Sequence, residues 1–295
     1  MKIGYPCVNE CLPCSSSSTF RLASYREERL VETVSNNLAC LRQILAYNQE
    51  HGLLFFRMSS GLVPFASHPV NTFDWQSYFL PTFQEIGEYI KQHAMRISMH
   101  PDQFVVLNSP KPETVQNSIA ELVYQGSVMD LMGLDRTAKL QIHGGGAYGD
   151  KPTAISRFVE IYQQLPESVK ARLVVENDDR TYSLRDCLEI HERTGIPILF
   201  DNFHHECNHN GEPMREAILL AAQTWGEQDG VLMMDYSSQQ PGERKGKHVT
   251  SMQEELFREF MGQIEGIDAD IMLEIKDKEA SALQAVAILR ELERV

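Results

Sequence analysis

The 295-residue sequence predicts an α/β fold, a (β/α)₈ TIM barrel in which residues 1–295 form a single domain. Eight short, apolar, β-branched runs alternate with longer amphipathic stretches, which matches the strand and helix count of such a barrel. The length also suits this fold, because barrels of about 250 residues usually form one unit. No G-x-G-x-x-G follows the first run, so the nucleotide-binding form of an open doubly wound sheet has no support.

The expected strands are short and apolar, as in parallel sheets whose strands are buried on both faces. In chain order they cover residues 2–7, 53–60, 96–100, 139–144, 173–178, 197–203, 230–238 and 270–277. An amphipathic helix is expected after each strand, at about 25–51, 74–93, 113–133, 152–165, 183–194, 212–226, 250–265 and 279–293. Three of these helices have a residue suited to capping near their start, namely Thr153, Ser183 and Ser251.

The composition is that of an ordinary globular protein, with 42% hydrophobic and 23% charged residues. No uncharged apolar run approaches the roughly 20 residues that span a bilayer, and the chain starts without a signal-peptide pattern. A cytoplasmic location is therefore the default expectation. The net charge of −14 argues against a nucleic-acid partner, since DNA-binding domains are usually basic. Clustered carboxylates that bind cations would offset part of that charge.

Three of the six cysteines, Cys7, Cys11 and Cys14, have the C-x₃-C-x₂-C spacing that holds an iron–sulfur cluster in radical S-adenosylmethionine enzymes. Pro13 stands where such motifs often have an aromatic residue. The many imidazole and carboxylate groups would also have no function in a radical enzyme. We interpret the cysteines as reduced thiols rather than disulfides, with Cys14 packed in the loop and Cys7 partly buried.

Side chains that bind metals follow seven consecutive expected strands, on the face where barrels hold their active sites. They combine imidazole with carboxylate, the ligands of Zn²⁺, Mn²⁺ or Fe²⁺. Because they exceed the ligands of one ion, we expect two or three divalent ions, which together can clamp the oxygens of a phosphodiester. The candidates are His68, His100, His143, Glu176, Asp201, His204, Asp235, His248 and Glu274.

Within this set, Glu176, Glu274 and His143 are the predicted catalytic residues, and the two glutamates are the best candidates to bridge ions. The remaining histidines are less informative. Those in expected helices or helix ends are interpreted as surface residues, and those beside His204 stay open between ligand and partner of a ligand. The first group is His51, His93 and His191, and the second is His205 and His209.

Taken as a set, the motifs resemble those of the UV damage endonucleases over Met1 to about Lys278. They include Ser98-Met99-His100-Pro101-Asp102-Gln103, Glu176-Asn177-Asp178-Asp179 and Phe200-Asp201-Asn202-Phe203-His204-His205. The resemblance implies a barrel related to endonuclease IV, with divalent ions that are usually Mn²⁺ and with Zn²⁺ or Mg²⁺ as alternatives. It implies incision of damaged double-stranded DNA on the 5′ side of cyclobutane pyrimidine dimers and 6-4 photoproducts, with abasic sites as a further substrate. A nucleoid-associated monomer without an obligate protein partner is expected.

The resemblance also assigns contacts near the lesion to Tyr5, Asn9, Gln103 and Phe104, where many members have Tyr in place of Phe104. The seventh strand departs from the family pattern. Many members read Lys-x-His there, whereas this chain has Met233-Met234-Asp235. Asp235 is predicted to replace the imidazole as a ligand, and the coordination of one ion stays open.

Two other functions fit parts of the pattern. A metal-dependent sugar isomerase or epimerase is the alternative from another reaction class, because such barrels also use His, Asp and Glu around one or two ions. It requires a small enclosed pocket. A non-catalytic metal-binding scaffold explains poorly why the ligands are spread over so many strands.

Overall fold

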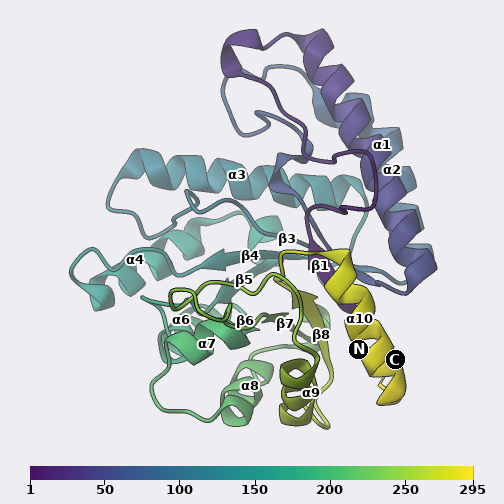
Figure 1. The fold of residues 1–295 in the computed structure, drawn as a ribbon. Helices are drawn as coiled ribbons and strands as arrows, with labels where there is room; N and C mark the ends of the chain where they lie inside the picture. Colours follow the sequence, from purple (N-terminus) through teal and green to yellow (C-terminus); the bar gives the residue numbers. More distant parts are fainter. Residues whose placement is uncertain (295) are drawn as a thin grey trace.

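A computed structural model describes residues 1–294 of the chain and has eight parallel strands that close into a barrel in chain order (Figure 1). Each strand pairs with its sequence neighbour, and β1 pairs with β8 to complete the ring. The predicted (β/α)₈ barrel is therefore confirmed. The strands are β1 (Ile3–Pro6), β2 (Phe55–Met58), β3 (Arg96–Met99), β4 (Lys139–His143), β5 (Leu173–Glu176), β6 (Ile198–Asp201), β7 (Leu232–Tyr236) and β8 (Ala269–Leu273).

Helices surround the barrel and return the chain from the end of each strand to the start of the next. The long ones agree with the expected amphipathic stretches. They are α1 (Glu27–His51), α2 (Trp75–Gln92), α3 (Pro112–Leu131), α4 (Lys151–Gln164), α6 (Leu184–Thr194), α8 (Met214–Ala222), α9 (Glu254–Gln263) and α10 (Glu279–Glu291). Short helices lie in the connections: α5 (Glu167–Lys170), α7 (Asn202–Cys207), and the 3₁₀ turns η1 (Leu22–Ser24), η2 (Ser60–Leu62) and η3 (Glu227–Asp229). No helix of the described residues is long and apolar enough to cross a membrane.

Of the three predicted helix caps, only Ser183 is confirmed, where it forms a capping box with Asp186 at the start of α6. Helix α4 is capped by Asp150, whose carboxylate accepts from the amide of Thr153 at 3.2 Å. Thr153 therefore lies inside the first turn. Helix α9 begins at Glu254, so Ser251 precedes it by too many residues to cap it.

Alternate residues of the strands point into the barrel and form layers along its axis. One layer is apolar and consists of Phe55, Val174, Leu199, Met233 and Met272. Met233, which belongs to the departure from the family pattern in the seventh strand, therefore packs in the core. The next inward residue of each strand lies two positions further along, toward the carboxyl ends. That layer is polar and contains the candidate site.

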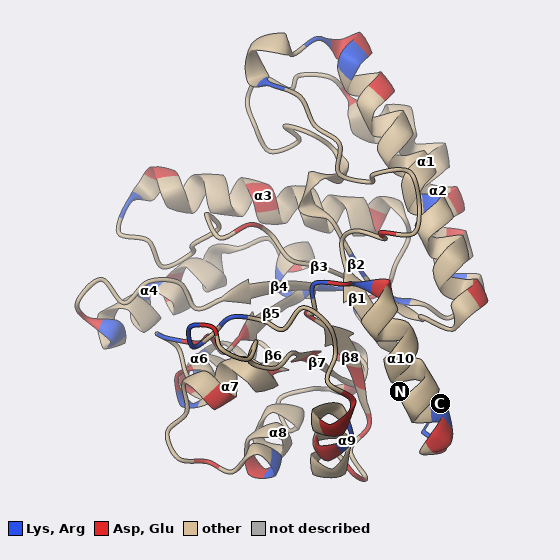
Figure 2. Ribbon diagram, in the orientation of Figure 1, with Lys and Arg blue, Asp and Glu red and all other residues tan. Residues whose placement is uncertain are grey.

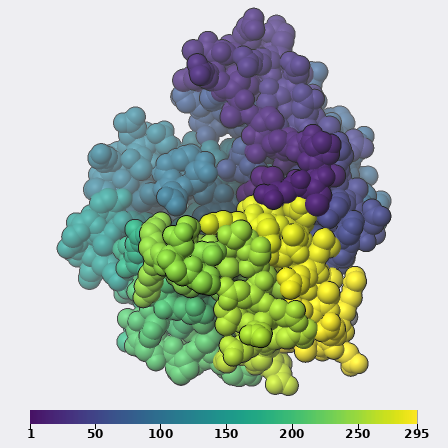
Figure 3. All heavy atoms as spheres, viewed as in Figure 1, coloured from purple at the N-terminus to yellow at the C-terminus, as the bar shows by residue number. Residues whose placement is uncertain are grey.

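The N-terminal loop lies against α1 and is joined to it by a disulfide between Cys14 and Cys40, whose Cα atoms are 5.7 Å apart. The prediction that the cysteines are reduced thiols is wrong at this pair. It rested on the expected compartment, whereas the pairing depends on how the loop folds back onto the helix. Because Cys14 is bonded to Cys40, the three-cysteine iron–sulfur site has no structural support. Figure 3 shows the N-terminal part of the chain, in purple, as a projection above the barrel.

Candidate metal centre

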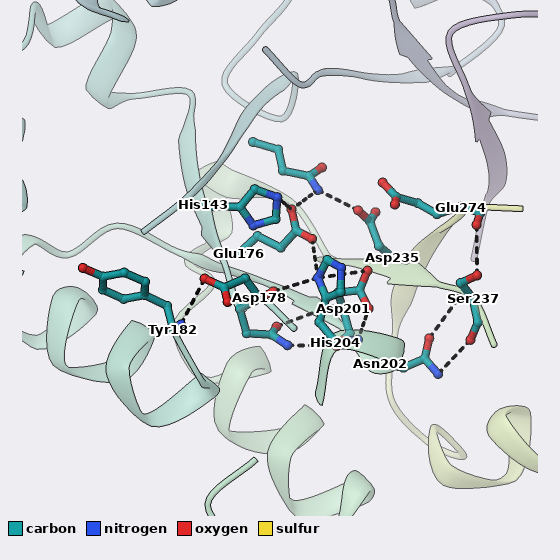
Figure 4. A network of polar contacts seen from close by, with 12 residues as sticks. His143, Glu176, Asp178, Tyr182, Asp201, Asn202, His204, Asp235, Ser237 and Glu274 are labelled. Carbon is teal, nitrogen blue, oxygen red and sulfur yellow. Dashed lines mark hydrogen bonds and ion pairs between the residues drawn. The ribbon is translucent and has the colours of Figure 1, made fainter. Parts of the chain in front are cut away.

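Glu176, the last residue of β5, lies at the centre of the polar layer and is almost completely buried. Its Oε2 atom is 3.5 Å from Nε2 of His100 and 3.6 Å from Nε2 of His143. Its Oε1 atom is 3.0 Å from Nδ1 of His204. Three imidazoles from different segments therefore converge on one carboxylate, as the close-up of Figure 4 shows for two of them.

The chain passes directly from β6 into α7, and this connection places Asp201 beside His204. Asp201 caps α7 by accepting from the amide of His204 at 2.7 Å through Oδ1. Its Oδ2 atom lies 3.5 Å from Nδ1 of His204 and has no hydrogen-bond partner among the described residues. Asn177 holds the backbone of Asp201 through a pair of hydrogen bonds of 2.9 and 3.0 Å. Asp201 is thus fixed with one oxygen free for a cation.

Side-chain amides and hydroxyls extend the strand pairing beyond the end of the barrel. Asn202 exchanges two hydrogen bonds with the backbone of Ser237, at 3.0 and 3.2 Å. The hydroxyl of Ser237 then donates to the carbonyl oxygen of Glu274 at 3.0 Å. These contacts tie the ends of β6, β7 and β8 together, which fixes the positions of the acidic residues that they carry (Figure 4).

The donor groups fit divalent cations. Their oxygen and nitrogen atoms lie within 4.8 Å of one another in each of three groups, which are His100/His143/Glu176, Glu176/Asp201/His204 and Asp201/Asp235/Glu274. Buried atoms without a hydrogen-bond partner among the described residues include Oδ2 of Asp201. Such atoms are costly unless they bind something. The mixture of imidazole and carboxylate suits Mn²⁺, Zn²⁺ or Fe²⁺.

The electrostatics of the cluster favour bound cations. Burial alone would raise the pKa of Glu176, but His143, His100 and His204 hold it well below its usual range. Burial raises the pKa of Asp201 to about 7. Burial lowers the pKa of His204, but Asp201 and Glu176 outweigh this and raise it to about 12. Protons on Asp201 and His204 would therefore have to leave before a metal ion could bind there.

The seventh strand contributes Asp235, which is fully buried beside Arg57 of β2. Nη2 of Arg57 lies 2.7 Å from both oxygens of Asp235, and Nη1 donates to Oε1 of Glu274. Gln141 of β4 donates to Asp235 at 2.6 Å and to Glu176 at 2.5 Å. We did not predict Arg57 or Gln141. Their signal in the sequence is a polar residue at an inward position of a strand that is otherwise apolar.

The other predicted ligands lie further out. His248 has its Nδ1 2.9 Å from the carbonyl oxygen of Glu274 and 4.0 Å from that residue's Oε2. His68 is exposed in the loop after η2, where its Nδ1 accepts from the amide of Val70 at 3.0 Å. It belongs to none of the three groups. The ligand assignments of His68, His248 and Asp235 stay predictions.

The four residues predicted to contact substrate fall into two places. The Tyr5 side chain is buried and donates to Asn48 at 2.6 Å. Asn9 donates to the Tyr5 hydroxyl at 2.8 Å. This pair therefore supports the N-terminal loop. Gln103 and Phe104 instead lie on the loop after β3, where Gln103 lines the cavity and Phe104 is 56% exposed.

An open cavity of about 630 Å³ is lined by residues of the candidate metal centre. Its floor includes His100, His143, Glu176 and His204, and one side of its rim is basic. The basic residues of the rim are Arg244, Lys247, Lys276 and Lys278. Two of these belong to the loop between β7 and α9, whose arms are joined by an antiparallel bridge from Gln239 to His248. Figure 2 shows Lys and Arg concentrated on this loop, whereas Asp and Glu are spread over the outer helices.

Comparison with known proteins gives a consistent result over the whole chain. The family model described as UV-endonuclease UvdE matches residues 1–295. The chain is 35% identical over 296 residues to the UV DNA damage endonuclease of Clostridium perfringens (strain 13 / Type A), which covers 100% of this chain and 72% of that relative. It is similar in structure to the crystal structure of SacUVDE, with a TM-score of 0.96, 45% sequence identity and 100% coverage of both chains.

More distant structures share the barrel alone. A D-psicose 3-epimerase from Clostridium cellulolyticum has a TM-score of 0.59 at 12% identity, over 86% of this chain and 94% of that chain. Endonuclease IV from Thermus thermophilus has a TM-score of 0.58 at 15% identity, over the same shares. At such low identity a common fold does not imply a common function.

Proposed function

Because this chain belongs to the UvdE family of UV endonucleases and is thus a DNA repair endonuclease, we propose that it cuts the DNA backbone by metal-dependent hydrolysis on the 5′ side of UV photoproducts. Cyclobutane pyrimidine dimers and 6-4 photoproducts are the proposed substrates, and abasic sites are a second class. The observation that carries the metal dependence is the convergence of His100, His143 and His204 on the buried carboxylate of Glu176.

The proposed ligands are shared between the strand ends and the loops. Glu176 belongs both to the group with His100 and His143 and to the group with Asp201 and His204, so it would be available to two ions. Glu274, His248 and His68 complete the set at the margin of the cavity. Divalent ions, with Mn²⁺ the proposed metal, lower the pKa of a water and neutralise charge that develops on phosphate oxygens. Asp235 is a separate case, because both of its oxygens accept from Arg57.

The chain's own residues position the DNA. The basic rim faces the cavity lined by the metal centre and is suited to phosphate groups on either side of the cut. It also answers the objection raised by the net charge of −14, because the acidic residues lie mainly on the outer helices. Gln103 lines the cavity from the loop after β3, and its neighbour Phe104 is exposed on the same loop. A photoproduct weakens stacking, so bending the DNA onto these residues costs less there.

The alternative function, a sugar isomerase or epimerase, is not favoured by the site. Such enzymes enclose a small substrate, whereas this cavity is open and has a basic rim. The similarity to D-psicose 3-epimerase, at 12% identity, concerns the fold.

An incision assay tests the proposal. Purified protein, stripped of metal and reloaded with Mn²⁺, is incubated with end-labelled duplexes that carry a photodimer, a 6-4 photoproduct, an abasic site or no lesion. We expect cutting on the 5′ side of each lesion, and none of the undamaged duplex or after chelation. Cutting that persists after chelation would refute the metal dependence, and equal cutting of the undamaged duplex would refute the damage specificity.

A further inference from the structure

The third group of potential ligands, Asp201/Asp235/Glu274, already contains a cation that belongs to the protein. The guanidinium of Arg57 donates to Asp235 through Nη2, at 2.7 Å from each oxygen, and to Glu274 through Nη1. The Arg57 side chain is only 3% exposed, and that of Asp235 is fully buried. A buried pair of this kind is stable only when each charge has its partner, so Arg57 and Asp235 depend on each other.

The oxygens of Asp235 have little capacity left for a metal ion. Oδ2 accepts from both Arg57 and Gln141, and Oδ1 accepts from Arg57. Gln141 in turn accepts from Nη2 of Arg57 at 2.7 Å, so the amide and the guanidinium fix each other. A metal ion bonded to an oxygen of Asp235 would lie within about 5 Å of the guanidinium nitrogen, where the two cations repel.

The charges of the layer lead to the same conclusion. Its carboxylates are Glu176, Asp201, Asp235 and Glu274, and Arg57 neutralises one of them. With two divalent ions and neutral imidazole ligands, the layer has one excess positive charge. The single negative charge of one phosphodiester group would neutralise it. A third divalent ion would leave two positive charges uncompensated.

We propose that the Arg57 guanidinium takes the place of a third metal ion, so that this chain binds two divalent ions and Asp235 is the anchor of Arg57 rather than a metal ligand. Arg57 is then a positioning residue. It orients Glu274 by donating to Oε1, and the other oxygen, Oε2, then lies 4.0 Å from Nδ1 of His248. This inference rests on the proposed metal-dependent function but makes a separate statement about the number of ions.

Counting bound manganese tests the inference without any DNA. Metal-free protein is reloaded with Mn²⁺ and desalted, and manganese per chain is measured by mass spectrometry and by electron paramagnetic resonance. We expect two ions in the wild type, two in Asp235→Asn and three in Arg57→Met. In Arg57→Met the group Asp201/Asp235/Glu274 loses its cation and can bind another metal ion. Arg57→Lys keeps a cation and should keep two ions.

Arg96→Met is the matched control. Arg96 is also a buried arginine, paired with Asp270 at 3.0 Å, but it lies at the opposite end of β3 from His100. The Arg96→Met variant should bind two ions. Three ions in the wild type, two in a folded Arg57→Met or one in Asp235→Asn would each overturn the inference. If Arg57→Met or Asp235→Asn does not fold, the count for the wild type decides, since three ions there overturn the inference. No ion at all in the wild type would refute the proposed metal-dependent function itself.

Discussion

Glu176 Oε1 lies 3.0 Å from His204 Nδ1, which couples the end of β5 to the first turn of α7. The same carboxylate reaches His100 and His143 through its other oxygen. One side chain thus joins the two groups of ligands that are best suited to hold metal ions, and its loss should affect both.

We therefore expect Glu176→Gln to lose Mn²⁺-dependent cutting of UV-irradiated duplex by more than about a hundredfold, since even residues that only orient a ligand cost ten- to a hundredfold. The amide has the same shape but cannot bridge two cations. Circular dichroism should show an unchanged fold. His93→Gln, at the end of α2, is the control and should keep full activity. Retained cutting by Glu176→Gln would refute the metal assignment.

The raised pKa values of Asp201 and His204 predict how metal binding depends on pH. Asp201, whose pKa is raised to about 7 by burial, is protonated below that pH and ionised above it in the metal-free protein. His204, whose pKa is raised to about 12 by Asp201 and Glu176 against burial, is protonated on both sides of pH 7. Binding should therefore release two protons at pH 6 and one at pH 8. The apparent affinity should rise about a hundredfold per pH unit below 7 and about tenfold above it.

Calorimetry in two buffers of different ionisation enthalpy measures this proton release directly. Asp201→Asn should bind metal more weakly and release fewer protons at pH 6 than the wild type, because it lacks both the carboxyl proton and the charge that raises the pKa of His204. An equal release by the wild type at the two pH values would show that Asp201 does not carry the titrating proton.

The ends of the predicted strands place most of the candidate residues on one face of the barrel. Inward residues recur at every second position, so Glu176, Asp201 and Glu274 could be placed at strand ends on one face from the sequence. The closed barrel then brings them together, because all strands are parallel and in chain order.

Contacts across the barrel and within long loops could not be predicted in the same way. The pairing of Arg57 with Asp235 joins β2 to β7, and it depends on closure of the barrel rather than on any local pattern. The burial of Tyr5 against Asn48, and the disulfide of Cys14, depend on the path of the loop after β1. No turn residue or period in the sequence fixes that path.

The basic rim predicts a specific dependence on salt. Lys247→Ala combined with Lys276→Ala should weaken binding of damaged duplex and lower the slope of log affinity against log salt by about two. Their side chains line the cavity but belong to none of the candidate ligand groups, so kcat should change little while KM rises. A double variant at Lys91 and Lys170, which line other cavities, makes the same charge change and should leave both quantities unaltered. A fall in kcat at constant KM would refute the rim as a DNA-binding surface.

We expect the exposed ring of Phe104 to help distinguish damaged from undamaged DNA. Its ring is 56% exposed on the loop after β3, close to the metal centre through its neighbour Gln103, and a large exposed aromatic side chain is suited to stack on unpaired bases. Phe104→Ala should reduce cutting of photodimer duplex about tenfold to a hundredfold, since stacking is worth about 1–3 kcal/mol per base. Phe104→Tyr should retain cutting because it keeps the ring. Tyr78→Ala is the control, since Tyr78 is 57% exposed on α2 and lines neither the cavity nor its neighbour beside His143. If Phe104→Ala and Phe104→Tyr cut equally well, and manganese content is unchanged in both, the aromatic ring has no function in lesion recognition.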